Sequence, residues 1–254
     1  EPDIWELLYD IEKIAAEGGA EILPEIHEHY TIPMKIADKG FWIYDFALPV
    51  LTLHALYNHT GKYLKEWLLK CPMKQFTTLD THDGIGIVDV KDLLPDEEIE
   101  KVKDQMYSKG ANVKMIYSSE AYNNLDIYQV NTTYYSALGN NDSAYLLARA
   151  IQFFAPGIPQ VYYVGMLAGE NDIDLMERTK NGRDINRHYY TAEDVENEQS
   201  RPVVQKLKEL MELRNTHPAF SLDGNIEVNA DDDRLVIIRK HGSDKITLTA
   251  NLTT

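Results

Sequence analysis

Two carboxylates in this sequence lie where buried strands would end. Glu25 comes near the end of the apolar segment 20–26, and Asp83 follows the apolar segment Phe76–Thr81. Histidines accompany both, since His27 follows Glu25 and His82 precedes Asp83. In barrels of alternating strands and helices, side chains at the C-terminal ends of the strands form the active site. The pattern therefore indicates a site where two carboxylates act on one substrate.

Each of these residues also has a purely structural interpretation. Glu25 could pair with a nearby Arg or Lys at an ordinary strand end, whereas a functional Glu25 would be a general acid. Glu25, His27 and His29 are spaced two apart, so they could share one face of an extended segment and bind a metal. Because no further Cys, His or Asp cluster completes such a set, we expect no metal.

The His82-Asp83 pair could simply cap a turn. However, Gly84 and Gly86 follow it directly, and glycine allows another molecule to approach the backbone closely. This arrangement favours a ligand site.

Two polar loops could add to that site. The segment 123–129 carries amides together with Asp126, Tyr128 and Gln129. Such a loop commonly does no more than solvate itself, but an aromatic ring beside amides also suits sugar hydroxyls. In the second loop, 182–186, Arg183 could either pair with Asp184 at the surface or face a ligand.

Composition excludes several classes of protein. The 254 residues are 44% hydrophobic and 26% charged, which is typical of a globular protein. A formal net charge of −16 argues against nucleic acid as a partner. The longest apolar stretches, such as 42–53, are too short and too interrupted to span a membrane. Cys71 is the single cysteine, which excludes an intrachain disulfide and favours a reducing, cytoplasmic location.

Hydrophobic periodicity predicts alternating helices and strands. This order is typical of a parallel α/β fold, although it does not distinguish an open sheet from a barrel. A polar loop is expected over 166–198, and an antiparallel β domain at the end. The expected helices are 4–16, 30–39, 50–57, 62–69, 96–109, 142–154 and 203–214, and the expected strands are 20–26, 41–48, 76–81, 160–165, 226–228, 234–239 and 246–252.

The sequence contains no Gly-x-Gly-x-x-Gly motif and no Walker-type loop, which argues against nucleotide binding. The last residues, 245–254, stop inside an alternating strand pattern, and residue 1 is not a methionine. We therefore expect the chain to be part of a longer polypeptide.

Six segments carry a resemblance to a known family. They are LPEIHEHY, YDFALP, LDTHDGIG, NLDIYQVN, QFFAPGIPQVYYVG and GRDINRHYY, in this order. Together they resemble the sucrose phosphorylase group of the α-amylase family of glycoside hydrolases, over residues 1 to about 220. The family fold is a (β/α)8 TIM barrel with inserts and a C-terminal antiparallel β domain.

The resemblance implies that this chain is the C-terminal half of such a barrel. Residues 1–83 would hold strands 5–7 of the barrel with their helices. An insert with the acceptor loop would occupy 84–139, and strand 8 with its flanking helices would occupy 140–220. The start of the C-terminal β domain would be 221–254.

The resemblance also implies roles for single residues. Glu25 matches the family's general acid/base and Asp83 its transition-state stabiliser. The nucleophilic Asp of the family would lie upstream of residue 1. The matching substrate-binding residues are His27 on the acceptor side, His82 and Arg183 near the glucosyl unit, and Asp126, Tyr128 and Gln129 in a mobile acceptor loop.

The implied reaction is transfer of a glucosyl unit from sucrose to inorganic phosphate by double displacement, with retention and without a cofactor. Related enzymes acting on sucrose 6′-phosphate or glucosylglycerate are the alternatives. Leu125 and Tyr128 offer a second phosphate no extra cation, which favours plain sucrose. A catalytically silent carbohydrate-binding fragment also stays open, and unpaired strand edges could join two copies into a homodimer.

Overall fold

The structure of the chain is a computed structural model that describes residues 2–112 and 129–253. Of the expected acceptor loop, Asp126 and Tyr128 lie outside the described residues, while Gln129 lies within them.

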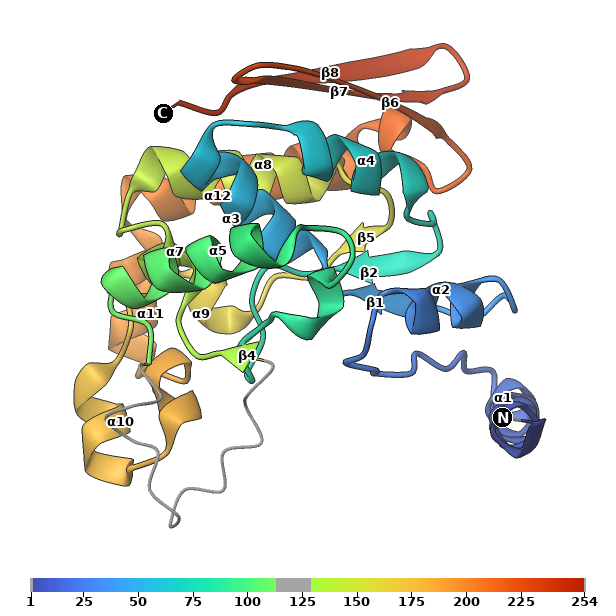
Figure 1. The fold of residues 1–254 in the computed structure, drawn as a ribbon, viewed down its shortest axis with the longest axis horizontal. Coiled ribbons are helices and arrows are strands. Elements are labelled where there is room, and N and C mark those ends of the chain that lie inside the picture. Colours follow the sequence, from blue (N-terminus) through green and yellow to red (C-terminus); the bar gives the residue numbers. More distant parts are fainter. Residues whose placement is uncertain (1, 113–128, 254) are drawn as a thin grey trace.

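A parallel sheet forms the centre of the molecule (Figure 1). Its strands β1 (Ile43–Asp45), β2 (Gln75–Thr77) and β5 (Ile158–Pro159) follow the order β1-β2-β5. Ile43 pairs with Gln75, and Phe76 pairs with Ile158. Parallel pairing directs the carboxyl ends of all three strands to the same edge. The predicted parallel α/β arrangement is confirmed, and it fixes where polar strand ends can meet.

Helices cover the sheet, and several of them begin at a proline or at a capping side chain. Between β1 and β2 lie α3 (Leu48–Asn58), with Pro49 in its first turn, and α4 (Lys62–Lys70). Helix α8 (Asp142–Phe154) begins where the Asn141 side chain accepts a hydrogen bond from the Ala144 amide, and α12 (Pro202–Thr216) begins at its proline. The main apolar core joins these helices to the β domain, and Ile43 of β1 lies in a second, smaller cluster with Ile36 and Phe41.

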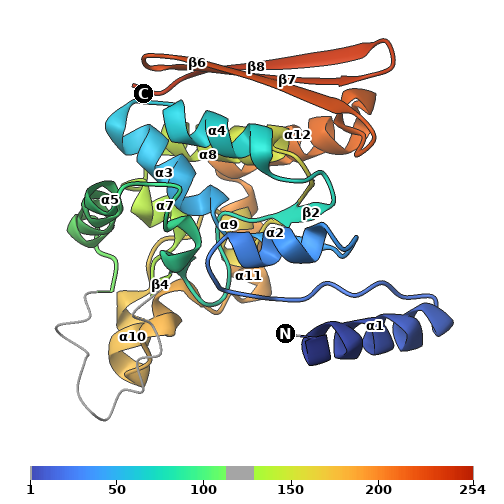
Figure 2. The same cartoon turned by 45° about the vertical axis from the view of Figure 1, so that its right-hand side comes forward.

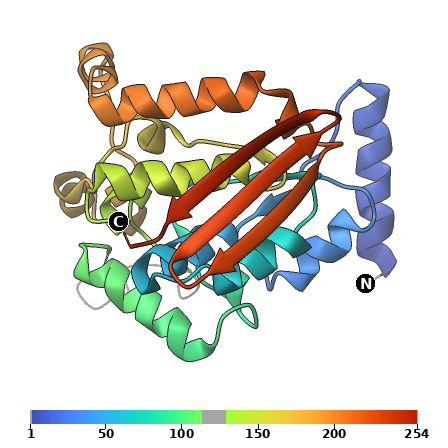
Figure 3. The same cartoon turned by 90° about the horizontal axis from the view of Figure 1, so that it is seen from above.

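The C-terminal β domain is an antiparallel sheet laid across the helices (Figure 3). It contains β6 (Asn225–Asp231), β7 (Arg234–His241) and β8 (Asp244–Asn251), close to the predicted positions. Alternate residues such as Leu235 and Ile237 face the core. The buried Arg239 donates hydrogen bonds to the carbonyls of Phe154 and Ala155 at the end of α8.

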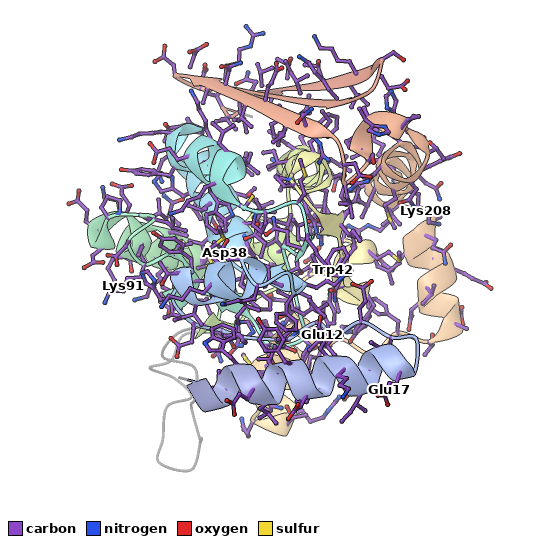
Figure 4. All side chains as sticks on the ribbon, turned by 90° about the vertical axis from the view of Figure 1, so that its right-hand side faces the viewer. Glu12, Glu17, Asp38, Trp42, Lys91 and Lys208 are labelled. Atoms are coloured by element: carbon purple, nitrogen blue, oxygen red, sulfur yellow. The ribbon has the colours of Figure 1, made fainter. Side chains whose placement is uncertain are left out.

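Helix α1 (Pro2–Glu17) stands apart and is joined to the body by an extended segment (Figure 2). Trp5 and Leu8 pack against α2 (Thr31–Ala37) and β1, whereas an adjacent side of the helix exposes an apolar stripe. Figure 4 shows Glu12 on the side of α1 that faces the body, Glu17 near the end of the helix, and Trp42 further into the body. The exposed stripe contains Ile4, Leu7, Ile11 and Ile14.

Of the remaining elements, α5 (Asp96–Ser108) packs on α3, and η4 (Pro218–Phe220) packs on β7 and β8. The others are short: η1 (Val88–Val90), the antiparallel pair β3 (Ile85–Gly86) and β4 (Gln129–Val130), α7 (Tyr134–Ala137), α9 (Tyr163–Met166), α10 (Ile173–Thr179), η3 (Gly182–Asn186) and α11 (Ala192–Gln199).

Three expectations were wrong. Segment 20–26 is irregular, because no ladder of backbone hydrogen bonds joins it to β1. The strand expected over 160–165 is replaced by the two-residue β5 and by α9, where the Met166 amide bonds back to Tyr162. The loop expected over 166–198 contains α10, η3 and α11.

The predicted boundaries after residues 83, 139 and 220 remain predictions. In the described residues, every helix is too short or too polar to cross a bilayer.

Candidate active site

Carboxylates and histidines from two distant segments meet beyond the carboxyl edge of the sheet. Glu25 and His27 come from the irregular segment after α1, and Asp83 comes from the loop after β2. One side-chain atom of each lies within 4.8 Å of the others. Glu25 and Asp83 therefore lie close together, although the segment that carries Glu25 is not a strand, and their roles remain predictions.

Asp83 is held by cations. Its Oδ1 lies 2.9 Å from Arg183 and 3.5 Å from Arg187, and its side chain is 14% exposed. His82 Nε2 lies 3.3 Å from the same oxygen. Arg187 also donates a 2.7 Å hydrogen bond from Nε to the His82 carbonyl, which fixes both partners. Two guanidinium groups therefore hold the Asp83 side chain in place.

Local capping places Arg183 at the site. Helix η3 begins after Asn181, whose side chain accepts a hydrogen bond from the Arg183 amide. At the other end of η3, the Asn186 side chain donates to the Thr81 carbonyl at 2.9 Å. The arginine loop is therefore tied to the chain that carries Asp83.

A buried ion pair lies next to the chain that leads to Asp83. Arg149 of α8 lies 2.6 Å from Asp80, and both side chains are at most 5% exposed. Arg149 also binds Gln152, whose amide donates to the carbonyls of Thr77 and Gln160. Removing one partner of such a pair typically costs about 3–5 kcal/mol. Gly165 is required here, since a Cβ at that position would lie 2.0 Å from Asp80 Oδ2.

Glu25 has a different environment. Its side chain is 51% exposed, and its Oε1 lies 3.6 Å from His27 Nε2. No arginine or lysine pairs with Glu25 among the described ion pairs. The Glu25 carboxyl group is therefore accessible to a substrate, as the proposed general acid/base must be.

His27 is held by stacking and by charge. Its ring stacks on Phe46 with the centroids 3.9 Å apart, and Nδ1 lies 3.9 Å from Asp89 Oδ2. Burial by itself lowers the pKa of His27, but the carboxylates of Asp89, Glu25 and Asp83 outweigh burial and raise that pKa above its usual value. His27 therefore holds its proton to a higher pH than an isolated histidine does.

The structure brings most of the predicted site residues together. Glu25, His27, His82, Asp83 and Arg183 share one cluster. Gln129 is buried in β4, opposite Gly86 of β3. Asp126 and Tyr128 lie outside the described residues.

The metal set of Glu25, His27 and His29 is not formed. The His29 ring instead hydrogen bonds to Thr31 at 2.8 Å and to Asp92 at 3.0 Å. The close trio of Glu25, His27 and Asp83 is also a poor cation site, because Arg183 lies against the Asp83 oxygen.

Sequence reasoning missed four residues. Arg187 could have been found, because it lies four residues after Arg183 in the same motif. Asp80 and Arg149 are 69 residues apart, and the one signal was a charged residue on the apolar face of a helix. Asp89 gave no sequence signal, since an acidic residue after a glycine turn is ordinary.

We compared the chain with known proteins to identify its relatives. No protein-family model matches the chain. A sucrose phosphorylase from Streptococcus mutans is 59% identical over 96% of the chain and 51% of that enzyme. A glucosylglycerol phosphorylase from Marinobacter adhaerens is 47% identical over 95% of the chain and 50% of that enzyme.

Solved structures agree. The crystal structure of a sucrose 6F-phosphate phosphorylase from Thermoanaerobacter thermosaccharolyticum matches 100% of the chain and 52% of that enzyme, with a TM-score of 0.92 and 41% identity. An α-amylase from Anoxybacillus matches 98% of the chain with a TM-score of 0.60 and 16% identity, which shows the fold alone. The neighbours are (β/α)8 enzymes, so the predicted fold class is confirmed.

The chain spans about half the length of the curated relatives it matches, which is consistent with the predicted C-terminal part. Over nearly its whole length, this chain is similar in sequence to sucrose phosphorylases.

Proposed function

We propose that this chain supplies the acid/base half of a retaining sucrose phosphorylase. The reaction transfers a glucosyl unit from sucrose to inorganic phosphate, and it yields α-glucose 1-phosphate and fructose. The observation that carries the proposal is the meeting of an exposed Glu25 with an arginine-bound Asp83. The 59% identity to the Streptococcus mutans sucrose phosphorylase supports the choice of substrate.

The two carboxylates divide the chemistry. Glu25 donates a proton to the departing fructose oxygen, and it then accepts a proton from the incoming phosphate. Asp83 stays ionised and hydrogen bonds to glucosyl hydroxyls, which stabilises the oxocarbenium-like transition state. The nucleophile that forms the covalent glucosyl intermediate is proposed to lie in the half that the relatives have in addition.

Binding residues surround the pair. Arg183 and His82 orient the glucosyl unit, and His27 faces the acceptor. Gln129 and, outside the described residues, Asp126 and Tyr128 form the acceptor loop, where fructose and phosphate alternate. No cofactor and no metal are assigned to this reaction.

A second candidate differs in the acceptor alone. The matched crystal structure is that of a sucrose 6F-phosphate phosphorylase, and a glucosylglycerol phosphorylase is 47% identical. Phosphorylases for sucrose 6′-phosphate or for a glucosylated glycerol or glycerate would keep the same glucosyl site. A silent carbohydrate-binding role for the chain remains the alternative from another class.

The test uses a chimaera that joins residues 1–254 to the remaining half of the Streptococcus mutans relative. We expect it to release α-glucose 1-phosphate from sucrose and phosphate. We expect the chain alone to release none, because without a nucleophile Glu25 cannot form the covalent intermediate that retention requires. The exposed apolar stripe of α1 should also make the chain alone associate in size-exclusion chromatography.

Parallel assays with sucrose 6′-phosphate, glucosylglycerol and glucosylglycerate decide the acceptor. Robust turnover by the chain alone would refute the placement of the nucleophile, and a soluble but inactive chimaera would favour the silent fragment. A homodimer and a reducing, cytoplasmic location remain proposals, the latter based on the lone Cys71.

A further inference from the structure

A buried acid lies behind the candidate acceptor histidine. Asp89 in η1 is 3% exposed, and its Oδ2 faces His27 Nδ1 across 3.9 Å. Neither this oxygen nor the two ring nitrogens of His27 has a hydrogen-bond partner among the described residues. A buried carboxylate without hydrogen bonds is costly unless a charge compensates it, and the imidazolium of His27 is the group in place to do so.

Gly86 makes this approach feasible. A Cβ at Gly86 would lie 2.0 Å from Asp89 Oδ2 and 3.8 Å from His27 Nδ1. Gly86 also pairs with Gln129, the described end of the acceptor loop. Because Gly86 has no side chain, there is room for the Asp89 carboxylate beside His27, the residue proposed to face the acceptor.

Both acidic and basic groups surround His27, and the basic ones, Arg183 and Arg187, lie behind Asp83. Glu25 and Asp83 face it across the site, and Asp89 itself lies near Glu28 and Asp45. Burial raises the pKa of Asp89, and His27 opposes that change. The Phe46 ring, with its centroid 3.9 Å away, packs against one face of the imidazole.

We propose that Asp89 is a positioning residue that holds His27 as an imidazolium directed at the acceptor, and that it thereby selects phosphate over water. This inference rests on the proposed function. A phosphate oxyanion gains a charge-assisted hydrogen bond from an imidazolium, whereas water gains far less. Asp89 does not contact the substrate, and it acts through His27 alone.

The first experiment measures His27 directly, in the chimaera. Histidine ring signals are followed by NMR from pH 5 to pH 9, with the His27 signal assigned from His27→Asn. Asp89→Asn keeps the shape but removes the charge, so His27 should lose its proton at lower pH than in the parent. Unchanged titration of His27 would overturn the proposal.

The second experiment measures how much of the glucosyl unit is transferred to phosphate and how much to water. With sucrose and fixed phosphate, the ratio of glucose 1-phosphate to free glucose reports phosphate against water. Asp89→Asn should lower this ratio about tenfold at neutral pH, the effect of losing one charge-assisted hydrogen bond. In the parent, the ratio should also fall as the pH rises and His27 loses its proton. In Asp89→Asn, this fall should begin at a lower pH, because His27 loses its proton at a lower pH. Equal loss of both products would show a merely structural role.

Two further variants keep the test decisive. Gly86→Ala retains the Asp89 charge but displaces the carboxylate, so it should also lower the ratio of glucose 1-phosphate to free glucose. It serves as the test if Asp89→Asn fails to fold. Asp92→Asn removes the matching partner of His29, 3.0 Å away and outside the site, and should leave the ratio unchanged. If the chimaera is inactive, the proposed function fails, whereas the His27 titration still decides the role of Asp89.

Discussion

The two carboxylates of the candidate site are held in opposite ways. Asp83 is 14% exposed and contacts two arginines, whereas Glu25 is 51% exposed and contacts a histidine. The Asp83 loop is anchored through Asn186 and stands on the buried Asp80–Arg149 pair. The Glu25 segment has no regular secondary structure.

This contrast matches two chemical tasks. A group that stabilises positive charge must remain ionised and fixed, and arginines achieve both. A group that donates and accepts a proton in one cycle must not be locked in one protonation state. A carboxylate clamped by arginines beside one without such contacts is the arrangement that the proposed stabiliser and the proposed acid/base would need.

The largest expected effect is that of Glu25→Gln in the chimaera. Sucrose turnover should fall by about 10²–10⁴-fold, because glutamine cannot protonate fructose. A glucosyl fluoride should be affected much less in the first step, since fluoride leaves without a proton. Rates of glucose 1-phosphate release measure the first effect, and fluoride release measures the second.

The matched control is Glu28→Gln, an exposed glutamate three residues further along the same segment. It should retain parental turnover. Near-parental turnover of sucrose by Glu25→Gln would show that the unclamped carboxylate is not the acid/base.

The second prediction concerns the clamped partner. Asp83→Asn should lower kcat by about 10²-fold, as removal of a single electrostatic stabiliser does, while KM for sucrose changes little. The exposed Asp38→Asn is the control. An unchanged kcat with a raised KM would make Asp83 a ground-state binding residue instead.

Features determined by near neighbours were predictable from the sequence. The range 142–154 was predicted for α8, and the structure gives Asp142–Phe154, because Asn141 caps the helix locally. The antiparallel strands were found because their side chains alternate between core and solvent. Asp83 was found because it ends an apolar run.

Features determined by distant contacts were not predictable. Segment 20–26 has the apolar pattern of a strand, but a strand also needs a neighbour to pair with. Val161–Val164 is rich in β-branched and aromatic residues, yet the chain turns at α9, with Gly165 against Asp80 and Arg149. The clamp by Arg187 depends on a contact across 104 residues.

The smallest effect tests how much the clamp itself contributes. Arg187→Gln removes the guanidinium 3.5 Å from Asp83 and the hydrogen bond to the His82 carbonyl, while Arg183 remains at 2.9 Å. A partly exposed ion pair contributes about 1 kcal/mol, so kcat should fall by roughly three- to tenfold. Steady-state kinetics should show this loss in kcat rather than in KM, because the arginine acts through Asp83. Arg178→Gln, at an exposed position in α10, should match the parent.

In the Asp83→Asn background, Arg187→Gln should cause almost no further loss of kcat, since non-additive effects mark residues that act as one unit. Additive losses in the double variant would mean that Arg187 acts independently of Asp83.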